Sequence, residues 1–244
     1  MQPKSNAVDA AALNKKFRHH SATQVLEVAL KDLPLGKIAM VSSFGAESVA
    51  LLHLLAVIDN NTPVLFIDTR LLFTETLVYQ IEVSERLGLK DVRILQPSKD
   101  RIEREDPYGA LRFSDPDRCC RLRKTTVLEP ALQGFDAWIT GRKRFQSGSR
   151  KALEFFEFDA AQNKIKINPL AHWSAQDIAT YMEENRLPRH PLVDQGYPSI
   201  GCVPCTSKVC PGEEQRAGRW RNQQKTECGL HLEQLQPSPL GEKV

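Results

Sequence analysis

Short apolar runs alternate with amphipathic helical stretches through the first 140 residues. The runs typical of buried strands are 37–41, 64–68, 92–95 and 137–140. The stretches with apolar residues at helical spacing are 21–30, 49–58, 77–87 and 119–132. Because strands that alternate with helices form a parallel sheet covered on both faces, the pattern predicts a doubly wound α/β fold.

Beyond residue 150 the pattern becomes less regular. Residues 155–158 and 164–167 have the character of a β-hairpin, and 174–185 that of a helix. The segment that follows is rich in glycine, proline and cysteine and shows little periodicity. Since no repeat or low-complexity linker interrupts the chain, we expect one domain over 1–231 and a flexible tail over 232–244.

Three loops are candidates for a ligand site. Ligands of open α/β sheets bind at the carboxyl ends of the strands, so the loop 42–48, Asp68 and the loop after Thr140 should share one rim. The loop 42–48 places hydroxyls and unpaired N–H groups at the start of a helix, where a phosphate is favoured. A plain helix cap is the alternative for this loop and for Asp68, which could also contact a ribose or adenine.

Charge is close to balanced over the chain. Lysine and arginine number 33 and the acidic residues 30 in 244 residues, so the net charge of +3 does not suggest nucleic-acid binding. Anion binding must therefore come from local clusters, and two stand out, at 141–150 and 216–221. A solvated basic loop is the usual reading of such runs, but the position of 141–150 at a strand end favours anion recognition by guanidinium groups.

We expect a cytoplasmic protein without a membrane partner. The N-terminus lacks the apolar core of a signal peptide, and the longest apolar stretch, 49–58, is short and broken by His53. Because the cytosol keeps thiols reduced, the six cysteines are poor candidates for structural disulfides. Metal binding or redox chemistry is the better default.

Four of the cysteines form two pairs, Cys119 with Cys120 and Cys202 with Cys205. Their spacing is compatible with an iron–sulfur cluster, zinc or a redox dithiol. Adjacent cysteines favour a cluster, since neighbouring residues cannot easily aim both sulfurs at one tetrahedral ion. Cys228 stands alone between Lys225 and the downstream His231, where it is a candidate nucleophile or an incidental thiol.

Together these motifs closely resemble the assimilatory adenylyl-sulfate reductases over residues 40–231. The matching segments are 43–47, 68–69 with 72–76, Cys119-Cys120 followed by Arg123-Lys124, 141–150, 201–206, 216–220 and 225–231. The resemblance implies an adenine-nucleotide α-hydrolase-like fold of the PP-loop type. This is a mostly parallel sheet flanked by helices, with an irregular cysteine-rich C-terminal segment.

The resemblance also implies a reaction. Cys228 would attack adenosine 5′-phosphosulfate, forming a Cys S-sulfonate and AMP, and thioredoxin or glutaredoxin would release sulfite for cysteine biosynthesis. Catalytic residues by this match are Cys228, His231 and Lys124, and the ligands of one 4Fe-4S cluster per chain are Cys119, Cys120, Cys202 and Cys205. Substrate-binding residues are Ser42, Ser43, Gly45, Glu47, Asp68, Arg144, Arg150, Arg216 and Arg219. The sequence leaves room for a homo-oligomer.

Three residues depart from the family pattern. Arg70 stands where relatives usually have glycine, Lys143 where they generally have arginine, and Cys210 has no counterpart. Three other functions remain open: a reductase of 3′-phosphoadenosine 5′-phosphosulfate or of both nucleotides, an ATP-dependent adenylating enzyme, and a zinc-stapled binding module. The four paired cysteines favour the adenylyl-sulfate enzyme over the first, and the sequence Gly45-Ala46-Glu47 argues against the second.

Overall fold

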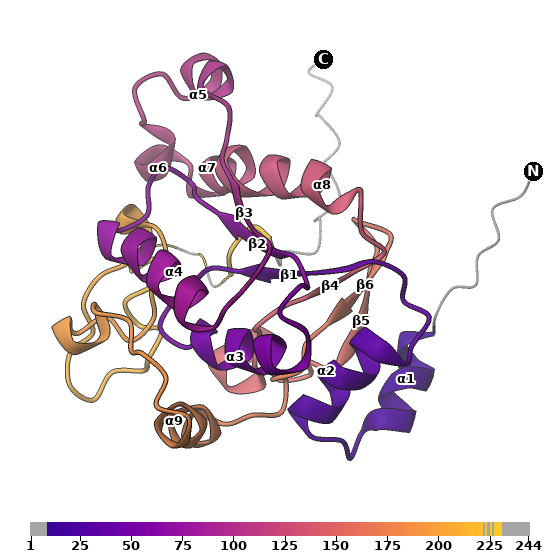
Figure 1. Ribbon diagram of the computed structural model, residues 1–244. Helices are drawn as coiled ribbons and strands as arrows, with labels where there is room; N and C mark the ends of the chain where they lie inside the picture. Colours follow the sequence, from indigo (N-terminus) through magenta and orange to yellow (C-terminus); the bar gives the residue numbers. More distant parts are fainter. Residues whose placement is uncertain (1–8, 222, 224, 226, 231–244) are drawn as a thin grey trace, which may run out of the picture.

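A six-stranded sheet forms the centre of the structure, a computed structural model that describes residues 9–221, 223, 225 and 227–230 (Figure 1). The strands are β1 (Ile38–Ser42), β2 (Val64–Ile67), β3 (Val92–Leu95), β4 (Ala137–Ile139), β5 (Phe156–Asp159) and β6 (Lys164–Ile167). They lie in the order β3-β2-β1-β4-β6-β5, and all neighbours run parallel except the antiparallel pair β5 and β6. The predicted parallel sheet and hairpin are both confirmed.

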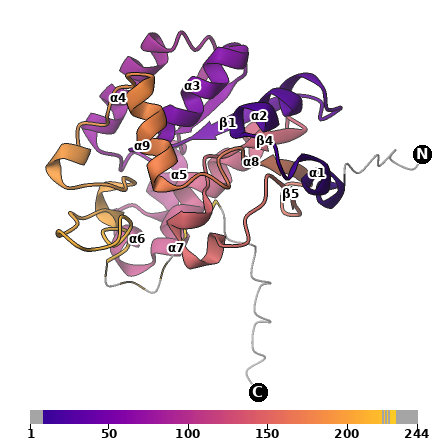
Figure 2. The ribbon, with the colours of Figure 1, turned by 90° about the horizontal axis from the view of Figure 1, so that it is seen from below.

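Helices cover both faces of the sheet. The α-helices are α1 (Ala10–Phe17), α2 (Ala22–Lys31), α3 (Ser48–Asp59), α4 (Thr74–Arg86), α5 (Lys99–Glu105), α6 (Leu111–Ser114), α7 (Pro116–Cys120), α8 (Thr126–Leu132) and α9 (Ala175–Glu184). Shorter turns are the π-helix η1 (Arg121–Thr125) and the 3-10 turns η2 (Arg144–Gln146), η3 (Gly148–Arg150), η4 (Val193–Gln195) and η5 (Val203–Cys205). In Figures 1 and 2, α8 lies on one face of the sheet and α2 and α3 lie on the other.

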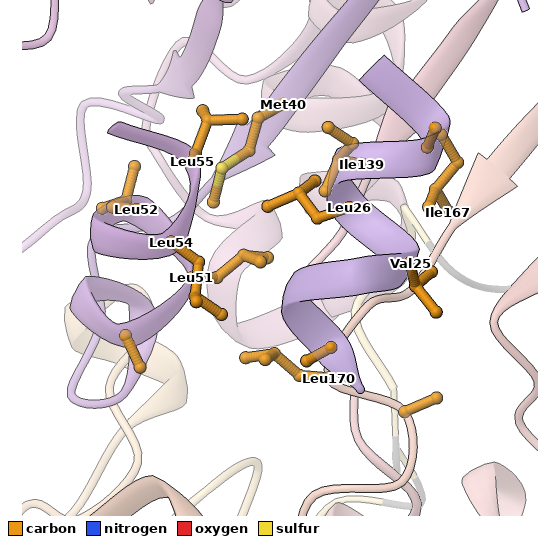
Figure 3. Close-up of a cluster of buried hydrophobic side chains, with 14 of the residues drawn as sticks. Val25, Leu26, Met40, Leu51, Leu52, Leu54, Leu55, Ile139, Ile167 and Leu170 are labelled. Atoms are coloured by element: carbon orange, nitrogen blue, oxygen red, sulfur yellow. The ribbon is translucent and has the colours of Figure 1, made fainter. Parts of the chain in front are cut away.

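The core has two parts because successive strand residues point to opposite faces of the sheet. In β1, Met40 packs in a cluster with Leu26 of α2 and Leu51 of α3 (Figure 3). Its neighbour Ala39 packs on the other face, in a cluster that includes Leu132 of α8. All five side chains are at most 1 % exposed. Burial on both faces fixes the strands, and so fixes the loops that leave their carboxyl ends.

Local signals placed most elements correctly, and the differences have physical causes. Ser21 caps α2 in a capping box with Gln24, as expected from its position. The helix expected over 119–132 is instead built from α7, η1 and α8, because a π turn interrupts the α-helical bonding after Cys120. Ile81, expected on the buried stripe of α4, is 55 % exposed, while Tyr79 and Val83 are buried.

Two parts of the sequence prediction, the tail 232–244 and His231, lie outside the described residues.

Among the described residues, no helix is both long enough and apolar enough to span a membrane.

His190 is a fully buried titratable group that packs against α4. Its Nδ1 accepts the backbone N–H of Leu192 at 3.2 Å, so its Nε2–H faces the Thr76 hydroxyl at 3.0 Å. Burial lowers the pKa of His190 to about 4. An unfolded histidine has a pKa of about 6.5, so below that pH the unfolded state binds a proton that the folded state does not.

We therefore expect stability to fall as the pH drops from about 6.5 towards 4. At pH 5 the contribution of His190 should lower the free energy of unfolding by about 1–2 kcal/mol relative to pH 7. Urea unfolding of the parent protein and of His190→Gln at both pH values measures this change in the free energy of unfolding. Glutamine does not titrate, so the variant should lack the contribution of His190. An identical pH dependence in the two proteins would contradict the assignment.

Candidate active site

A cavity of about 210 Å³ lies at the carboxyl ends of the parallel strands. Its walls come from the loop after β1, the loop after β4, residues 198–201, residues 215–220 and the C-terminal residues Cys228 and Leu230. Nine of the residues singled out from the sequence line it: Ser42, Ser43, Gly45, Glu47, Lys124, Arg150, Arg216, Arg219 and Cys228. Folding therefore brings together residues that are up to 186 positions apart in the chain.

The loop after β1 is shaped by its own hydroxyl groups. Ser42 Oγ accepts the N–H of Phe44 at 3.2 Å, and Ser48 Oγ accepts the N–H of Gly45 at 3.0 Å. Phe44 takes a left-handed conformation with φ of 46°, and its buried ring packs on Phe66, which offsets the strain of that conformation. The loop leads directly into α3, whose N-terminus faces the cavity through Ser48.

Glu47 joins this loop to the basic loop that follows β4. Its carboxylate accepts hydrogen bonds from Lys143 at 2.7 Å, Gln146 at 3.1 Å and Gln215 at 2.8 Å. Burial acts to raise the pKa of Glu47, but Lys143 and the hydrogen bonds from Gln215 and Gln146 together outweigh it, and the pKa is lowered. Lys143, 3 % exposed, is thus the buried partner of a carboxylate, a use that needs charge but not the fork of an arginine.

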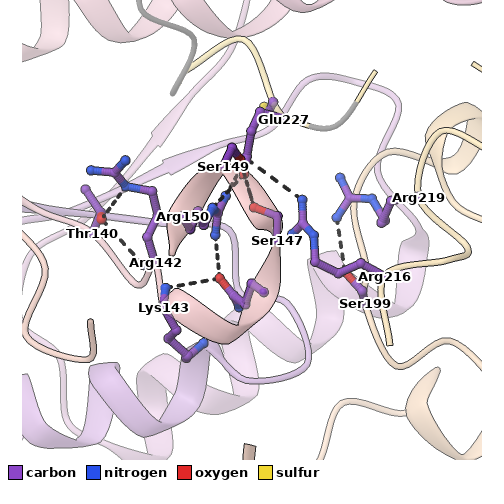
Figure 4. A network of polar contacts seen from close by, with 12 residues as sticks. Thr140, Arg142, Lys143, Ser147, Ser149, Arg150, Ser199, Arg216, Arg219 and Glu227 are labelled. Carbon is purple, nitrogen blue, oxygen red and sulfur yellow. Dashed lines mark hydrogen bonds and ion pairs between the residues drawn. The ribbon is translucent and has the colours of Figure 1, made fainter. Parts of the chain in front are cut away.

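The other cations of the basic loop have separate partners, and Figure 4 shows Arg142 and Arg150 pointing in different directions. Arg142 pairs with Glu157, and Arg144 donates to the Leu153 carbonyl at 2.6 Å and to Glu154 at 2.7 Å. Arg144 does not line the cavity, so it lies away from the other predicted substrate-binding residues. Arg150 is buried and turns inward to Glu227, one residue before Cys228.

A second pair of arginines closes the opposite wall. Arg219 lies over the Trp220 ring with 4.5 Å to the centroid and donates to the Ile200 carbonyl at 3.2 Å. Arg216 lies 5.6 Å from the centroid of the same ring. Gly201 makes room for Arg219, because a Cβ atom at this position would lie 2.3 Å from the guanidinium group. The Trp220 ring therefore positions both arginines, and the backbone at Gly201 packs closely against Arg219.

Lys124 and Cys228 meet where the π-helix follows the double cysteine. Lys124 Nζ donates to Cys228 Sγ at 3.2 Å. Burial acts to lower the pKa of Lys124, but the sulfur atoms of Cys202, Cys228 and Cys120 outweigh it and the pKa is raised. A hydrogen bond with Cys120 and the charge of Lys124 hold the pKa of Cys228 well below its usual range, against the effect of burial. Such a thiol is a ready nucleophile.

The four paired cysteines line a second, smaller cavity. Cys202 is fixed by a β-bridge to Leu72 and by a contact of 3.2 Å between its sulfur and Thr69 Oγ1. All four are free thiols. In the described part of the chain, no three Cys, His, Asp or Glu side chains are arranged to hold a single metal ion.

Two arginines face the same small cavity with unused donors. Arg112 and Arg123 line it, and the buried Nε–H of each has no acceptor among the described residues. Arg123 is held by a buried ion pair with Asp106 at 2.7 Å. Lys124 lines both cavities. Four cysteines beside the buried Arg123 and the partly buried Arg112 and Lys124 suit a negatively charged group with more than one ligand position. Lys124 connects that place to the Cys228 sulfur.

Asp68 does not line the main cavity. It binds the N–H of Arg70 at 2.8 Å and Gln96 at 2.7 Å, which shapes the turn after β2. Arg70 has φ of 60°, a left-handed conformation that glycine adopts without strain, so the glycine expected here from the family pattern would fit this turn. Sequence reasoning missed Glu227, Ser147 and Ser149 as interacting residues, although Glu227 is adjacent to the predicted nucleophile.

The sheet, the hydroxyl-rich loop after β1 and the cavity at the strand ends define an adenine-nucleotide α-hydrolase-like protein of the PP-loop type. The same fold occurs in an FMN adenylyltransferase of Candida glabrata, with a TM-score of 0.56 and 19 % identity over 85 % of this chain and 70 % of that one. Residues 37–208 match the phosphoadenosine phosphosulfate reductase domain. The chain belongs to this family, which confirms the fold and the family indicated by its motifs.

Individual relatives cover nearly the whole chain. An adenosine 5′-phosphosulfate reductase of Mesorhizobium japonicum is 45 % identical over 95 % of this chain and 91 % of its own. One from Bacillus subtilis is 42 % identical over 81 % and 84 %. A phosphoadenylyl-sulfate reductase structure from Candida auris, a phosphate complex, has a TM-score of 0.70 and 27 % identity over 82 % of this chain and 96 % of that one.

Proposed function

We propose that this protein reduces adenosine 5′-phosphosulfate to sulfite and AMP in the cytoplasm, as a step of assimilatory sulfate reduction. The observation that carries the proposal is the Cys228 sulfur, 3.2 Å from Lys124 Nζ at the wall of a cavity that Arg216 and Arg219 also line. The relatives from Mesorhizobium and Bacillus bear the name of this activity, which supports the choice of substrate.

The first step forms a bond between two sulfur atoms. The Cys228 thiolate attacks the sulfate sulfur, the S–O bond to the phosphate breaks, and its electron pair leaves with AMP. Lys124, Arg216 and Arg219 stabilise the negative charge that grows on the departing phosphate oxygen. The loop after β1, with Ser42, Ser43 and Gly45 at the head of α3, supports the nucleotide phosphate.

The second step returns the enzyme to its thiolate form. A thiolate of reduced thioredoxin, or of a glutaredoxin, attacks the Cys228 sulfur of the S-sulfonate and sulfite leaves with the electron pair. The second thiol of the donor then breaks the mixed disulfide, so the donor is oxidised by the two electrons that sulfur gains. This attack requires the Cys228 segment to move away from the cavity after the first step. His231, which follows it, is proposed to act near the reacting sulfur.

Cys119, Cys120, Cys202 and Cys205 are proposed to hold one 4Fe-4S cluster. The four cysteines around one cavity and the unpaired Nε–H donors of Arg112 and Arg123 support a negatively charged group with four cysteine ligands. When bound, the cluster supplies a fixed charge beside Lys124 that positions and tunes the substrate-binding cations.

The metal content tests the cofactor. Protein purified without oxygen is expected to be brown and to contain about four irons and about four acid-labile sulfides per chain. Cys202→Ser should lose them because a hydroxyl is a poor iron ligand, whereas Cys210→Ser, at an exposed position, should keep them. Zinc without iron would contradict the cluster and favour a zinc-stapled binding module.

The substrate is tested by comparing the two nucleotides. Sulfite release with reduced thioredoxin should be at least about tenfold more efficient on adenosine 5′-phosphosulfate than on its 3′-phosphorylated form. The alternative has a specific basis, because the matching domain and the Candida auris structure are both named for the 3′-phosphorylated nucleotide. Equal efficiency would indicate a dual enzyme, and the reverse preference would overturn the substrate assignment.

A further inference from the structure

Glu227 is a buried acidic residue that binds the basic loop after β4 (Figure 4). Its Oε1 accepts hydrogen bonds from Ser147 at 2.8 Å, Ser149 at 3.1 Å and Arg150 Nε at 2.7 Å. Its Oε2 accepts a second bond from Arg150, through Nη2 at 2.5 Å, and lies 3.9 Å from Arg216 Nη2. With five contacts to one carboxylate, the basic loop forms an anion-binding site, and the anion it binds is Glu227 of the same chain.

Besides the contacts of Cys228 itself, three contacts hold the segment 227–230 among the described residues, and Glu227 makes one of them. The backbone of Gly229 lies against Cys120, since a Cβ atom there would be 3.2 Å from the Cys120 Cβ. Leu230 packs on the apolar cluster under β1 and β4. Cys228 lies between these contacts, so the docking of its neighbours decides where its sulfur lies. Of the three, only the contact of Glu227 is ionic and depends on a single carboxylate.

The guanidinium group of Arg150 is committed to this contact. Its Nε and Nη2 bind Glu227, and its Nη1 donates to Gln146. Few of its donors are left for a nucleotide, although it lines the cavity. Direct binding of the substrate by Arg150 stays a prediction, and its observed partner is Glu227.

We propose that Glu227 is the anchor that docks the nucleophile-bearing segment, and that Arg150 acts through Glu227 to position Cys228 beside Lys124. The role of this anchor in turnover rests on the proposed function; the docking itself does not. Fixing the carboxylate restricts the backbone one residue away, which keeps the Cys228 sulfur in attacking distance. A displacement of about 1 Å in such a geometry can cost about 100-fold in rate.

Glu227→Gln tests the proposal, because the amide keeps the shape but loses the charge. We expect hydrogen exchange of the 227–230 amides to be about tenfold faster than in the parent protein. Because two arginines lose an opposing charge, the affinity for AMP should rise by about two- to fivefold. The kcat should fall by about 10- to 100-fold while KM stays the same or decreases. A residue that served stability alone would not move AMP affinity upward.

Glu213→Gln is the matched control. Glu213 forms a similar two-bond pair with Arg221, at 2.9 and 2.8 Å, but at the surface. This variant should leave exchange of 227–230, AMP affinity and kcat unchanged. Arg150→Gln should reproduce the effects of Glu227→Gln on hydrogen exchange and on kcat. The double variant should show little further change, since both substitutions break the same contact between Arg150 and Glu227. Arg150→Lys, which keeps one charged donor, should restore part of kcat.

If Glu227→Gln does not fold, Ser147→Ala with Ser149→Ala removes two donors and leaves every charge in place. We expect exchange of 227–230 to rise about threefold in that double variant. Unchanged exchange in the folded variants would overturn the anchor, and faster exchange with unchanged kcat would overturn its positioning role. If the parent protein turns over neither nucleotide but exchange of 227–230 is faster in Glu227→Gln, the result would support the anchor and refute the proposed function.

Discussion

Replacing Cys228 with serine is expected to lower sulfite release by about 10³-fold or more. The serine hydroxyl is not ionised at neutral pH, and it cannot form the sulfur–sulfur bond that thioredoxin later cleaves. Affinity for AMP should stay within about threefold, because Arg216, Arg219 and the loop after β1 are untouched. Sulfite release and calorimetric AMP binding measure the two effects separately.

Cys210→Ser is the matched control for this variant, since Cys210 is an exposed thiol on the same C-terminal segment of the chain. It should retain full turnover. Incubation of the parent protein with adenosine 5′-phosphosulfate and no reductant should add the mass of one SO₃ group to the peptide that contains Cys228. Residual turnover above about a tenth of the parent rate in Cys228→Ser would remove this thiol from the mechanism.

Lys124→Met is expected to have the second-largest effect, a loss of about 10²- to 10³-fold in kcat. Methionine approximates the length of the lysine stem but offers neither the proton donor 3.2 Å from the Cys228 sulfur nor a charge for the departing phosphate. Because Lys124 lines both cavities, the iron content of the variant is measured together with its rate.

Lys225→Met is the control for charge near the nucleophile. Lys225 is three residues from Cys228, but its amine pairs with Asp117. It should lose less than about fivefold in kcat. An equal loss in the two variants would indicate a general effect of positive charge rather than the contact between Lys124 and Cys228. A variant of Lys124 with full iron and nearly full activity would contradict the mechanism.

Elements with a strong local pattern could be predicted. The continuous apolar runs of β1 and β2 match strands buried on both faces, and Ser21 marks the start of α2 through a capping box. The π turn at Arg121–Thr125 could not be predicted in this way, because its residues are ordinary helix formers. Two residues of this turn, Arg123 and Lys124, line the cysteine cavity, which only the fold assembles.

Part of the candidate site could likewise be predicted from local sequence, and part could not. Ligands of open parallel sheets bind at the carboxyl ends of the strands, so the place of residues 42–48 at the cavity could be predicted from the chain alone. The basic loop could not be assigned residue by residue. Its four cations share a sequence context, yet Lys143 pairs with Glu47, Arg142 with Glu157, Arg144 with Glu154 and Arg150 with Glu227. Their partners are 10 to 96 positions away.

The order of residues by itself determined the fold class, the family and the set of chemical groups: a hydroxyl-rich loop, two cysteine pairs, two basic clusters and a thiol near the C-terminus. Hydrophobic periodicity and motif spacing are local properties, so the chain carries them without folding. Only the tertiary structure decided which of these groups meet. Long-range packing places Lys124 against Cys228 and Glu227 against Arg150, because buried charges must find partners wherever the fold brings them.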